Sequence, residues 1–162
     1  MKIRILSWNV RGANDRDKRK IIKSVIKSQM VDVVCLSETK IKEMTTRLVS
    51  SLGVGRHLDW SAVNSRGATG GILVFWDNRV FELVDLEEGE YSISCHFKNC
   101  EDRVVWVYTG VYGPVCRRER EDFWEELGAI RGLWSNPWCV GGDFNRIRFP
   151  GERSREEGYL QQ

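Results

Sequence analysis

The chain has 162 residues, the size of a single domain, and 41% of them are hydrophobic, as in ordinary water-soluble domains. No apolar run approaches the roughly 20 residues that a membrane-spanning helix needs. The net charge of +2 excludes little, but residues 1–30 hold nine Lys or Arg against two Asp, and residues 82–102 hold seven acids against one Lys. A basic N-terminal region suits a polyanionic partner, although its lysines also fit the solvated face of a helix.

The first forty residues predict a strand, a helix and a second strand. Residues 2–9 alternate apolar and polar side chains, as in a strand. Residues 17–30 follow a helical period, and Asp15 or Asp17 can cap the first turn. The apolar stripe of this helix is Ile21, Ile22, Val25, Ile26 and Met30, and its outward lysines are Lys20, Lys23 and Lys27. Residues 31–37 read as a strand buried on both faces, so the unit predicts a parallel strand pair joined by a helix.

The middle of the chain predicts short strands separated by turns. A weaker helical pattern covers residues 39–52, and a strand covers residues 60–64. The glycine-rich stretch 66–71 lacks the spacing of a nucleotide-binding loop and is interpreted as a turn. Residues 72–76 and 80–86 resemble the two arms of a hairpin.

The last third predicts another strand pair, a helix and a final strand. Residues 92–97 and 104–112 form the pair, and residues 138–141 form the last strand. Residues 119–134 are expected to be helical, and the tail 148–162 is polar with little core signal. The apolar side of that helix is Phe123, Trp124, Leu127, Ile130 and Trp134. The chain therefore predicts an α/β fold, a sandwich of two mixed sheets flanked by helices.

Cysteine usage indicates the redox compartment. The five cysteines form no CxxC pair, and their odd number argues against a disulfide framework. Cys35, Cys95 and Cys139 lie in apolar surroundings and are expected to be buried, reduced thiols. We therefore expect an intracellular protein.

Polar side chains follow four of the predicted strands, at the point where each strand ends. They are Asn9, Glu38, Tyr112 and the pair Asp143 and Asn145. Such strand ends converge on one crevice in open α/β sheets, and a carboxylate there is a ligand type that Mg²⁺ prefers. Asp143 and Asn145, two residues apart, project to the same side of an extended segment. One could accept a proton from water while the other donates to a phosphoryl oxygen. Gly141 and Gly142 are expected to let the backbone approach a substrate closely.

Four motifs, SWNVRG, LSETK, VYGP and GGDFN, follow each other in an order that resembles the endonuclease/exonuclease/phosphatase superfamily. The stretches GATGGILVFWD and PWCVGGDFNRIRFPGERS are most similar to endonuclease domains of plant LINE-type retrotransposons. The resemblance implies a DNase I-like fold and a DNA-nicking endonuclease that uses Mg²⁺, with Mn²⁺ as the alternative metal. It implies DNA as the partner, no membrane and no obligate protein partner, and a nuclear location if the substrate is chromosomal DNA.

The resemblance also implies a role for each matching position. Asn9 would orient the metal site or the phosphate, and Glu38 would hold the metal. Tyr112 would contact the phosphate. Asp143 would activate the attacking water, and Asn145 would stabilise the pentacovalent transition state.

The basic stretch 11–27 is expected to border this site only at its N-terminal end. Arg11 lies two residues after Asn9 and can reach a DNA phosphate. The lysines further along follow the helical period and should point to solvent.

The superfamily's C-terminal Ser-Asp-His motif has no counterpart in the chain. In that motif the histidine contacts the scissile phosphate and the aspartate orients it. The chain has two histidines, His57 and His96, and both are interpreted as structural or surface residues. We therefore expect residues 1–162 to be the N-terminal two thirds of one such domain, truncated at the C-terminus and inactive or weakly active.

Two alternatives remain open from the sequence. The first is another branch of the same superfamily, an abasic-site endonuclease or a phosphoinositide phosphatase, because the core chemistry is shared. The second is a non-catalytic retrotransposon fragment that binds nucleic acid weakly at most.

Overall fold

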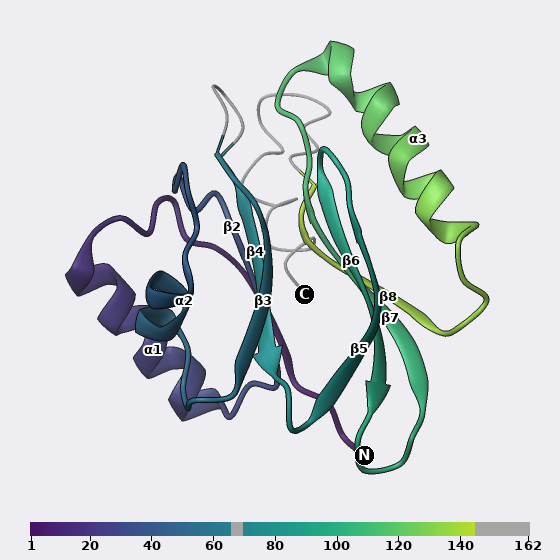
Figure 1. Ribbon diagram of the computed structural model, residues 1–162. Coiled ribbons are helices and arrows are strands. Elements are labelled where there is room, and N and C mark those ends of the chain that lie inside the picture. The colour runs from purple at the N-terminus through teal and green to yellow at the C-terminus, as the bar shows by residue number, and fades with distance from the viewer. Residues whose placement is uncertain (66–69, 145–162) are drawn as a thin grey trace.

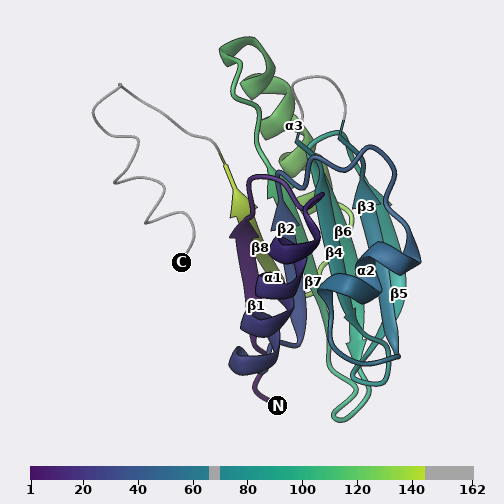
Figure 2. The same cartoon turned by 90° about the vertical axis from the view of Figure 1, so that its left-hand side faces the viewer.

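The computed structural model describes residues 1–65 and 70–144, arranged as two four-stranded sheets packed face to face (Figure 1). In this part of the chain, α1 and α2 cover the outer face of the first sheet, and α3 covers the outer face of the second (Figures 1 and 2). The predicted fold class, a mixed two-sheet sandwich flanked by helices, is confirmed. Most of the predicted turn at 66–71 and the tail 148–162 lie outside the described residues. Among the described helices, none is long and apolar enough to cross a membrane.

The first sheet has the strand order β1-β2-β4-β3. Its elements are β1 (Ile5–Asn9), α1 (Arg16–Gln29), β2 (Val33–Ser37), α2 (Thr46–Leu52), β3 (Leu58–Val63) and β4 (Ile72–Asp77). As predicted, β1 and β2 are parallel and are joined by α1, whose first turn is capped by the Asp15 side chain. β4 lies antiparallel between β2 and β3.

The second sheet has the order β5-β6-β7-β8. Its elements are β5 (Phe81–Glu88), β6 (Ser92–Asn99), β7 (Val105–Tyr112), the 3-10 turn η1 (Arg117–Glu119), α3 (Arg120–Arg131) and β8 (Trp138–Asp143). β6 and β7 form the predicted antiparallel pair, and β8 joins β7 in parallel.

The predicted hairpin of residues 72–76 and 80–86 is wrong, because β4 and β5 belong to different sheets. Both edges of β4 are already paired, with β2 on one side and β3 on the other, so β5 cannot add to it. The tight turn itself exists: the Arg79 backbone N–H donates to Asp77 Oδ1 at 2.9 Å, and the two side chains form an ion pair at 2.8 Å. The turn passes the chain from one sheet to the other.

The predicted helix over residues 39–52 is helical only from Thr46, after Thr45 caps the turn through Leu48 N–H. Before it the backbone is bonded to distant loops. Lys40 has a left-handed φ of 56° and its N–H donates to the Gly70 carbonyl at 2.6 Å. Because these hydrogen bonds come from elsewhere in the chain, tertiary structure overrides the local helical pattern.

Burial follows the predicted pattern, with four exceptions, one of which is Trp124 on the expected apolar side of α3, which is 47% exposed. Ile22 and Ile26 of α1 are buried, but Ile21 and Met30, also assigned to the apolar stripe, are 60% and 75% exposed. Cys139, expected to be buried, is exposed, whereas Cys35 and Cys95 lie in the core between the sheets. Burial raises the pKa of the Cys35 thiol to about 12, so it stays protonated.

The side chain of Glu126 fastens α3 to the turn between β5 and β6. Its carboxylate accepts hydrogen bonds from the backbone N–H of Glu90 at 2.6 Å and of Tyr91 at 3.1 Å, and from Ser92 Oγ at 2.7 Å.

Hydrogen bonds to a charged group each stabilise a fold by about 1.5–3 kcal/mol. We therefore expect Glu126→Ala to lower the free energy of unfolding by about 2–4 kcal/mol in urea denaturation, an estimate that allows for incomplete additivity. The exposed neighbour Glu125 is the control, and Glu125→Ala should stay within about 0.5 kcal/mol of the original. Equal losses from the two variants would contradict this account of α3.

Candidate active site

The strand ends named by the sequence do meet at one edge of the sandwich. Asn9 at the end of β1 pairs with Ser37 at the end of β2, and Glu38 is the next residue. Tyr112 at the end of β7 pairs with Asp143 at the end of β8. These carboxyl ends lie together at the upper end of the sandwich in Figure 1. Asn145 lies outside the described residues.

A hydrogen bond joins the two sheets at this edge. Asn9 Nδ2 donates to Asp143 Oδ2 at 2.7 Å, and Asn9 Oδ1 in turn accepts from the Arg11 backbone N–H at 3.0 Å. The second bond fixes which end of the Asn9 amide faces the aspartate. Because Asp143 is only 9% exposed, its carboxylate is held in one orientation, with little competition from water.

A second polar contact between the sheets lies two residues earlier along β1. Ser7 Oγ and Tyr108 Oη are 3.0 Å apart, and they too join β1 to the second sheet. Burial raises the pKa of Tyr108 well above its usual value, so its phenol remains neutral. Sequence reasoning missed this pair, because a serine and a tyrosine inside strands look like ordinary core or surface residues.

Glu38 is placed by close packing of the loops around it. Its φ of 54° is left-handed, which is uncommon for a non-glycine residue and clusters at functional sites. Its carbonyl accepts from the Gly12 N–H at 2.7 Å. A Cβ on Gly70 would come within 2.8 Å of Glu38 Cγ and 2.9 Å of its Cα, so only glycine fits against it. The Lys40 ammonium lies 3.6 Å from Glu38 Oε1.

The donor set at this edge suits a hard cation. Within residues 1–65 and 70–144, no three His, Cys, Asp or Glu side chains gather closely enough to form a metal cluster. Glu38 offers one carboxylate, and Asn9 Oδ1 keeps a second lone pair beyond the bond to Arg11. One or two protein oxygens, with water and phosphate completing the shell, is the way Mg²⁺ is usually bound, whereas structural Zn²⁺ takes four protein ligands.

Tyr112 lies at the site through its backbone and in the core through its ring. Its N–H donates to the Tyr91 carbonyl at 2.9 Å, and its side chain is 7% exposed within the cluster between the sheets. The Tyr112 ring therefore packs in the core behind the site.

The basic residues fall into the two predicted groups, one residue beside Asn9 and the lysines of α1 that face solvent. Arg11 is exposed next to Asn9, and its carbonyl accepts from Lys18 Nζ at 3.2 Å. The three lysines predicted to face solvent, Lys20, Lys23 and Lys27, are all exposed on α1.

Neither histidine lies at this edge. His96 is in the middle of β6, where its Nε2 is 2.8 Å from Asn136 Oδ1 and its ring lies 5.2 Å from that of Trp134. His57 is exposed at the opposite end, and its carbonyl accepts from the Asn78 N–H at 2.7 Å. The expectation that both are structural or surface residues is confirmed.

The glycines before Asp143 serve packing between strands. Gly142 has a φ of 124°, and a Cβ there would collide with the Val111 backbone of β7. A Cβ on Gly141 would come within 2.6 Å of Ser7 Oγ and 2.9 Å of Tyr108 Oη. Both glycines therefore allow close approach of protein to protein, where the sequence had suggested approach to a substrate.

We expect Gly142→Ala to destabilise the fold by roughly 3 kcal/mol or more, because it adds a clash to an unfavourable φ. Thermal melting of the variant measures the loss. Gly128→Ala is the matched control, since nothing lies within 4 Å of a Cβ there and alanine favours the helix. A melting temperature for Gly142→Ala equal to that of the control would be incompatible with the described β7–β8 pairing.

Comparison with known proteins identifies a matching family and a relative within the superfamily that the motifs resemble. A family model described as the endonuclease/exonuclease/phosphatase family matches residues 6–160. The exodeoxyribonuclease of Bacillus subtilis strain 168 is 30% identical over 157 residues, which cover 88% of this chain and 58% of that protein.

Solved structures of the same architecture are more distant in sequence. An endonuclease/exonuclease/phosphatase family protein from Bacteroides thetaiotaomicron superposes with a TM-score of 0.65 at 14% identity, covering 88% of this chain and 63% of that one. The catalytic domain of Xenopus laevis APE2 gives a TM-score of 0.63 at 21% identity, covering 90% and 59%. The chain thus spans less than two thirds of the length of each of these proteins.

Proposed function

The chain belongs to the endonuclease/exonuclease/phosphatase family, and from this membership we propose that it hydrolyses phosphodiester bonds of DNA with Mg²⁺, as the nicking endonuclease of a LINE-type retrotransposon. One contact carries the proposal. The Asp143 carboxylate is almost buried and is held by Asn9 at 2.7 Å, at the edge where Glu38 also lies. A carboxylate oriented in this way, next to a metal-ligating carboxylate, is suited to activating water beside a phosphate.

Each side chain has a task in this proposal, and Asn9 has two. Asp143 accepts a proton from the attacking water, and Asn9 keeps the Asp143 carboxylate in the accepting orientation. Glu38 and Asn9 Oδ1 would hold Mg²⁺, which when bound neutralises charge on the phosphate. Arg11, exposed beside Asn9, contacts a neighbouring phosphate. Asn145 keeps the role that the sequence resemblance implies, as a donor to the transition state.

Two observations favour DNA as the substrate. The relative from Bacillus subtilis is an exodeoxyribonuclease. The basic N-terminal region places Arg11 at the site edge, and Lys40 lies beside Glu38; both side chains are exposed to a polyanion. The LINE-type assignment rests on the motif resemblance over residues 67–77 and 137–154.

A nicking assay tests the proposal. The purified chain is incubated with supercoiled plasmid in Mg²⁺, in Mn²⁺ and in EDTA, and conversion to the open circle is followed. We expect slow nicking that needs the metal. Parallel arms with an abasic-site duplex and with a phosphoinositide test the other branches of the family. Faster turnover in either arm than on plasmid would replace the LINE-type assignment, and no metal-dependent nicking at all would favour a non-catalytic fragment.

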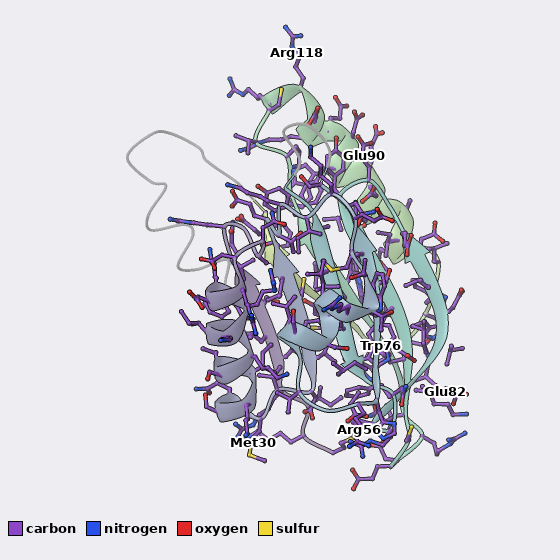
Figure 3. All side chains as sticks on the ribbon, turned by 60° about the vertical axis from the view of Figure 1, so that its left-hand side comes forward. Met30, Arg56, Trp76, Glu82, Glu90 and Arg118 are labelled. Carbon is purple, nitrogen blue, oxygen red and sulfur yellow. The ribbon has the colours of Figure 1, made fainter. Side chains whose placement is uncertain are left out.

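The Glu38→Gln variant tests the metal site separately. A neutral amide is a poorer Mg²⁺ ligand, so half-maximal nicking should require a higher Mg²⁺ concentration. Glu82→Gln is the matched control, because Glu82 is exposed at the opposite end of the sandwich, as Figure 3 shows. An unchanged Mg²⁺ requirement for Glu38→Gln would remove Glu38 from the metal site.

DNA binding should depend on salt through a few contacts only. Each phosphate neutralised by Lys or Arg contributes roughly −0.9 to the slope of log affinity against log salt concentration. Because the lysines of α1 face away from the site, we expect Arg11→Gln to reduce the slope by about 1 and Lys23→Gln to leave it unchanged. Fluorescence anisotropy at several salt concentrations gives the slope. A total slope near −8 would mean that the α1 lysines bind DNA after all.

A further inference from the structure

The two flanks of α3 differ in charge. The stripe that packs on the second sheet is Phe123, Leu127 and Ile130. To one side of it, Glu119, Asp122 and Glu126 face Tyr91 in the turn between β5 and β6. Burial, and then these acids together with Glu90, raise the pKa of Tyr91 to about 12. On this flank, Glu126 holds α3 on its own sheet through the hydrogen bonds described above.

The other flank carries an exposed indole and arginines. Trp124 lies in the first half of α3 and is 47% exposed. Arg120 lies four residues before it and Arg131 seven after, spacings that bring side chains to the same side of a helix. Glu121 shares this side. We name the surface formed by Arg120, Trp124 and Arg131 the outer flank of α3.

The indole of Trp124 lies on the outer face of the second sheet, near the end of β8 that carries Asp143. Its ring stacks on that of Phe144, with centroids 6.1 Å apart and planes 20° from parallel. Phe144 directly follows Asp143 and also contacts Phe123 at 6.0 Å. The stack is thus tied to the end of β8, one residue from the Asp143 carboxylate, while much of the indole remains open to solvent.

The outer flank continues into a cavity of about 460 Å³ at the far end of α3. Arg131, Trp134, Asn136 and Trp138 line it, so it combines a cation, aromatic faces and an amide. Arg131 lies two helical turns, or about 10 Å, from Trp124. Exposed aromatic residues alternating with arginines are typical of surfaces that bind single-stranded nucleic acid.

We propose that the outer flank of α3 binds a single strand of DNA beside the active site. One base stacks on Trp124, the phosphates that follow meet the arginines, and a further base reaches the cavity at Arg131. The choice of DNA as the ligand rests on the proposed function. The strand fits this flank because its negative charge complements the arginines, whereas the acidic flank repels it.

Binding in EDTA tests the proposal without turnover. Fluorescence anisotropy measures the affinity of the chain for a labelled 12-nucleotide DNA strand and for a 4-nucleotide one. Base stacking on an aromatic ring contributes enough for Trp124→Leu to weaken binding of the long strand about fivefold to a hundredfold, and Trp124→Phe should retain most of it. Arg131→Gln should weaken binding of the long strand more than of the short one. Ile21→Ala, which removes an exposed apolar side chain from α1, is the control and should change neither.

The outcomes separate this proposal from the proposed function. Binding that depends on Trp124 in a chain that never nicks plasmid would support the strand site and overturn the nuclease. Trp124→Leu with unchanged DNA affinity would overturn the strand site, even if the chain nicks plasmid. A lower melting temperature of Trp124→Leu with no loss of binding would mean that protein covers the indole, and this too would overturn the proposal. Circular dichroism of each variant verifies that it is folded.

Discussion

Replacing Asp143 with asparagine is expected to slow plasmid nicking by about 10²–10⁴-fold, the contribution usual for a positioned general base. The substitution preserves the shape of the side chain and leaves an oxygen that can still accept from Asn9 Nδ2. What it removes is the capacity to take a proton from water. Initial rates at saturating Mg²⁺ measure the effect, so that a change in metal affinity does not enter.

The losses of nicking rate caused by replacing Asn9 and Asp143 should not add in this measurement. Asn9→Ala is expected to cost less than Asp143→Asn, and the double variant is expected to be no slower than Asp143→Asn alone. Asp59→Asn, an exposed aspartate of β3, is the matched control and should keep the full rate. If Asp143→Asn nicks plasmid like the original, another group activates the water, and the proposed mechanism is wrong.

Appending a C-terminal segment that carries the superfamily's Ser-Asp-His motif is expected to raise the nicking rate by about 10²–10³-fold. The physical reason is the location of the two histidines. His96 is bonded to Asn136, and His57 lies at the opposite end of the sandwich, so neither supplies an imidazole donor at the Asn9–Asp143 edge. Losing one preorganised donor typically costs a rate factor of this size.

The control for this extension carries the same segment with its motif histidine replaced by alanine. Both versions should melt at the same temperature, and only the one with histidine should be fast. Equal rates would show that the segment acts through stability alone. A chain of 162 residues that already nicks as fast as the extended one would mean that another side chain takes the place of the histidine.

The strand ends of the site could be predicted from the sequence because they depend on local rules. A hydrophobic run stops, a polar residue follows, and parallel neighbours bring such positions to one edge. This reasoning brought Asn9, Glu38, Tyr112 and Asp143 to one edge, where the structure pairs Asn9 with Ser37 and Tyr112 with Asp143. It could not reveal that the Asn9 amide bonds directly to the Asp143 carboxylate, since the two residues are 134 positions apart.

The errors arose where distant segments decide the local structure. Residues 72–86 have the pattern of a hairpin, but β2 and β3 occupy both edges of β4. Residues 39–45 have helical character, but Gly70 holds the Lys40 backbone in a left-handed conformation. The exposure of Trp124 was missed in the same way: helical periodicity gives the direction of a side chain and cannot say whether a partner is there to cover it.

The Asn9–Asp143 bond also couples the chemistry to how the two sheets are docked. One partner comes from each sheet, so neither sheet alone contains an oriented carboxylate. A small slide of one sheet over the other would separate the pair while every ladder of hydrogen bonds within each sheet stayed intact. Residues behind the edge that fix the spacing between the sheets, such as Gly110 against Cys35 and Val74, would therefore affect the proposed reaction without touching the substrate.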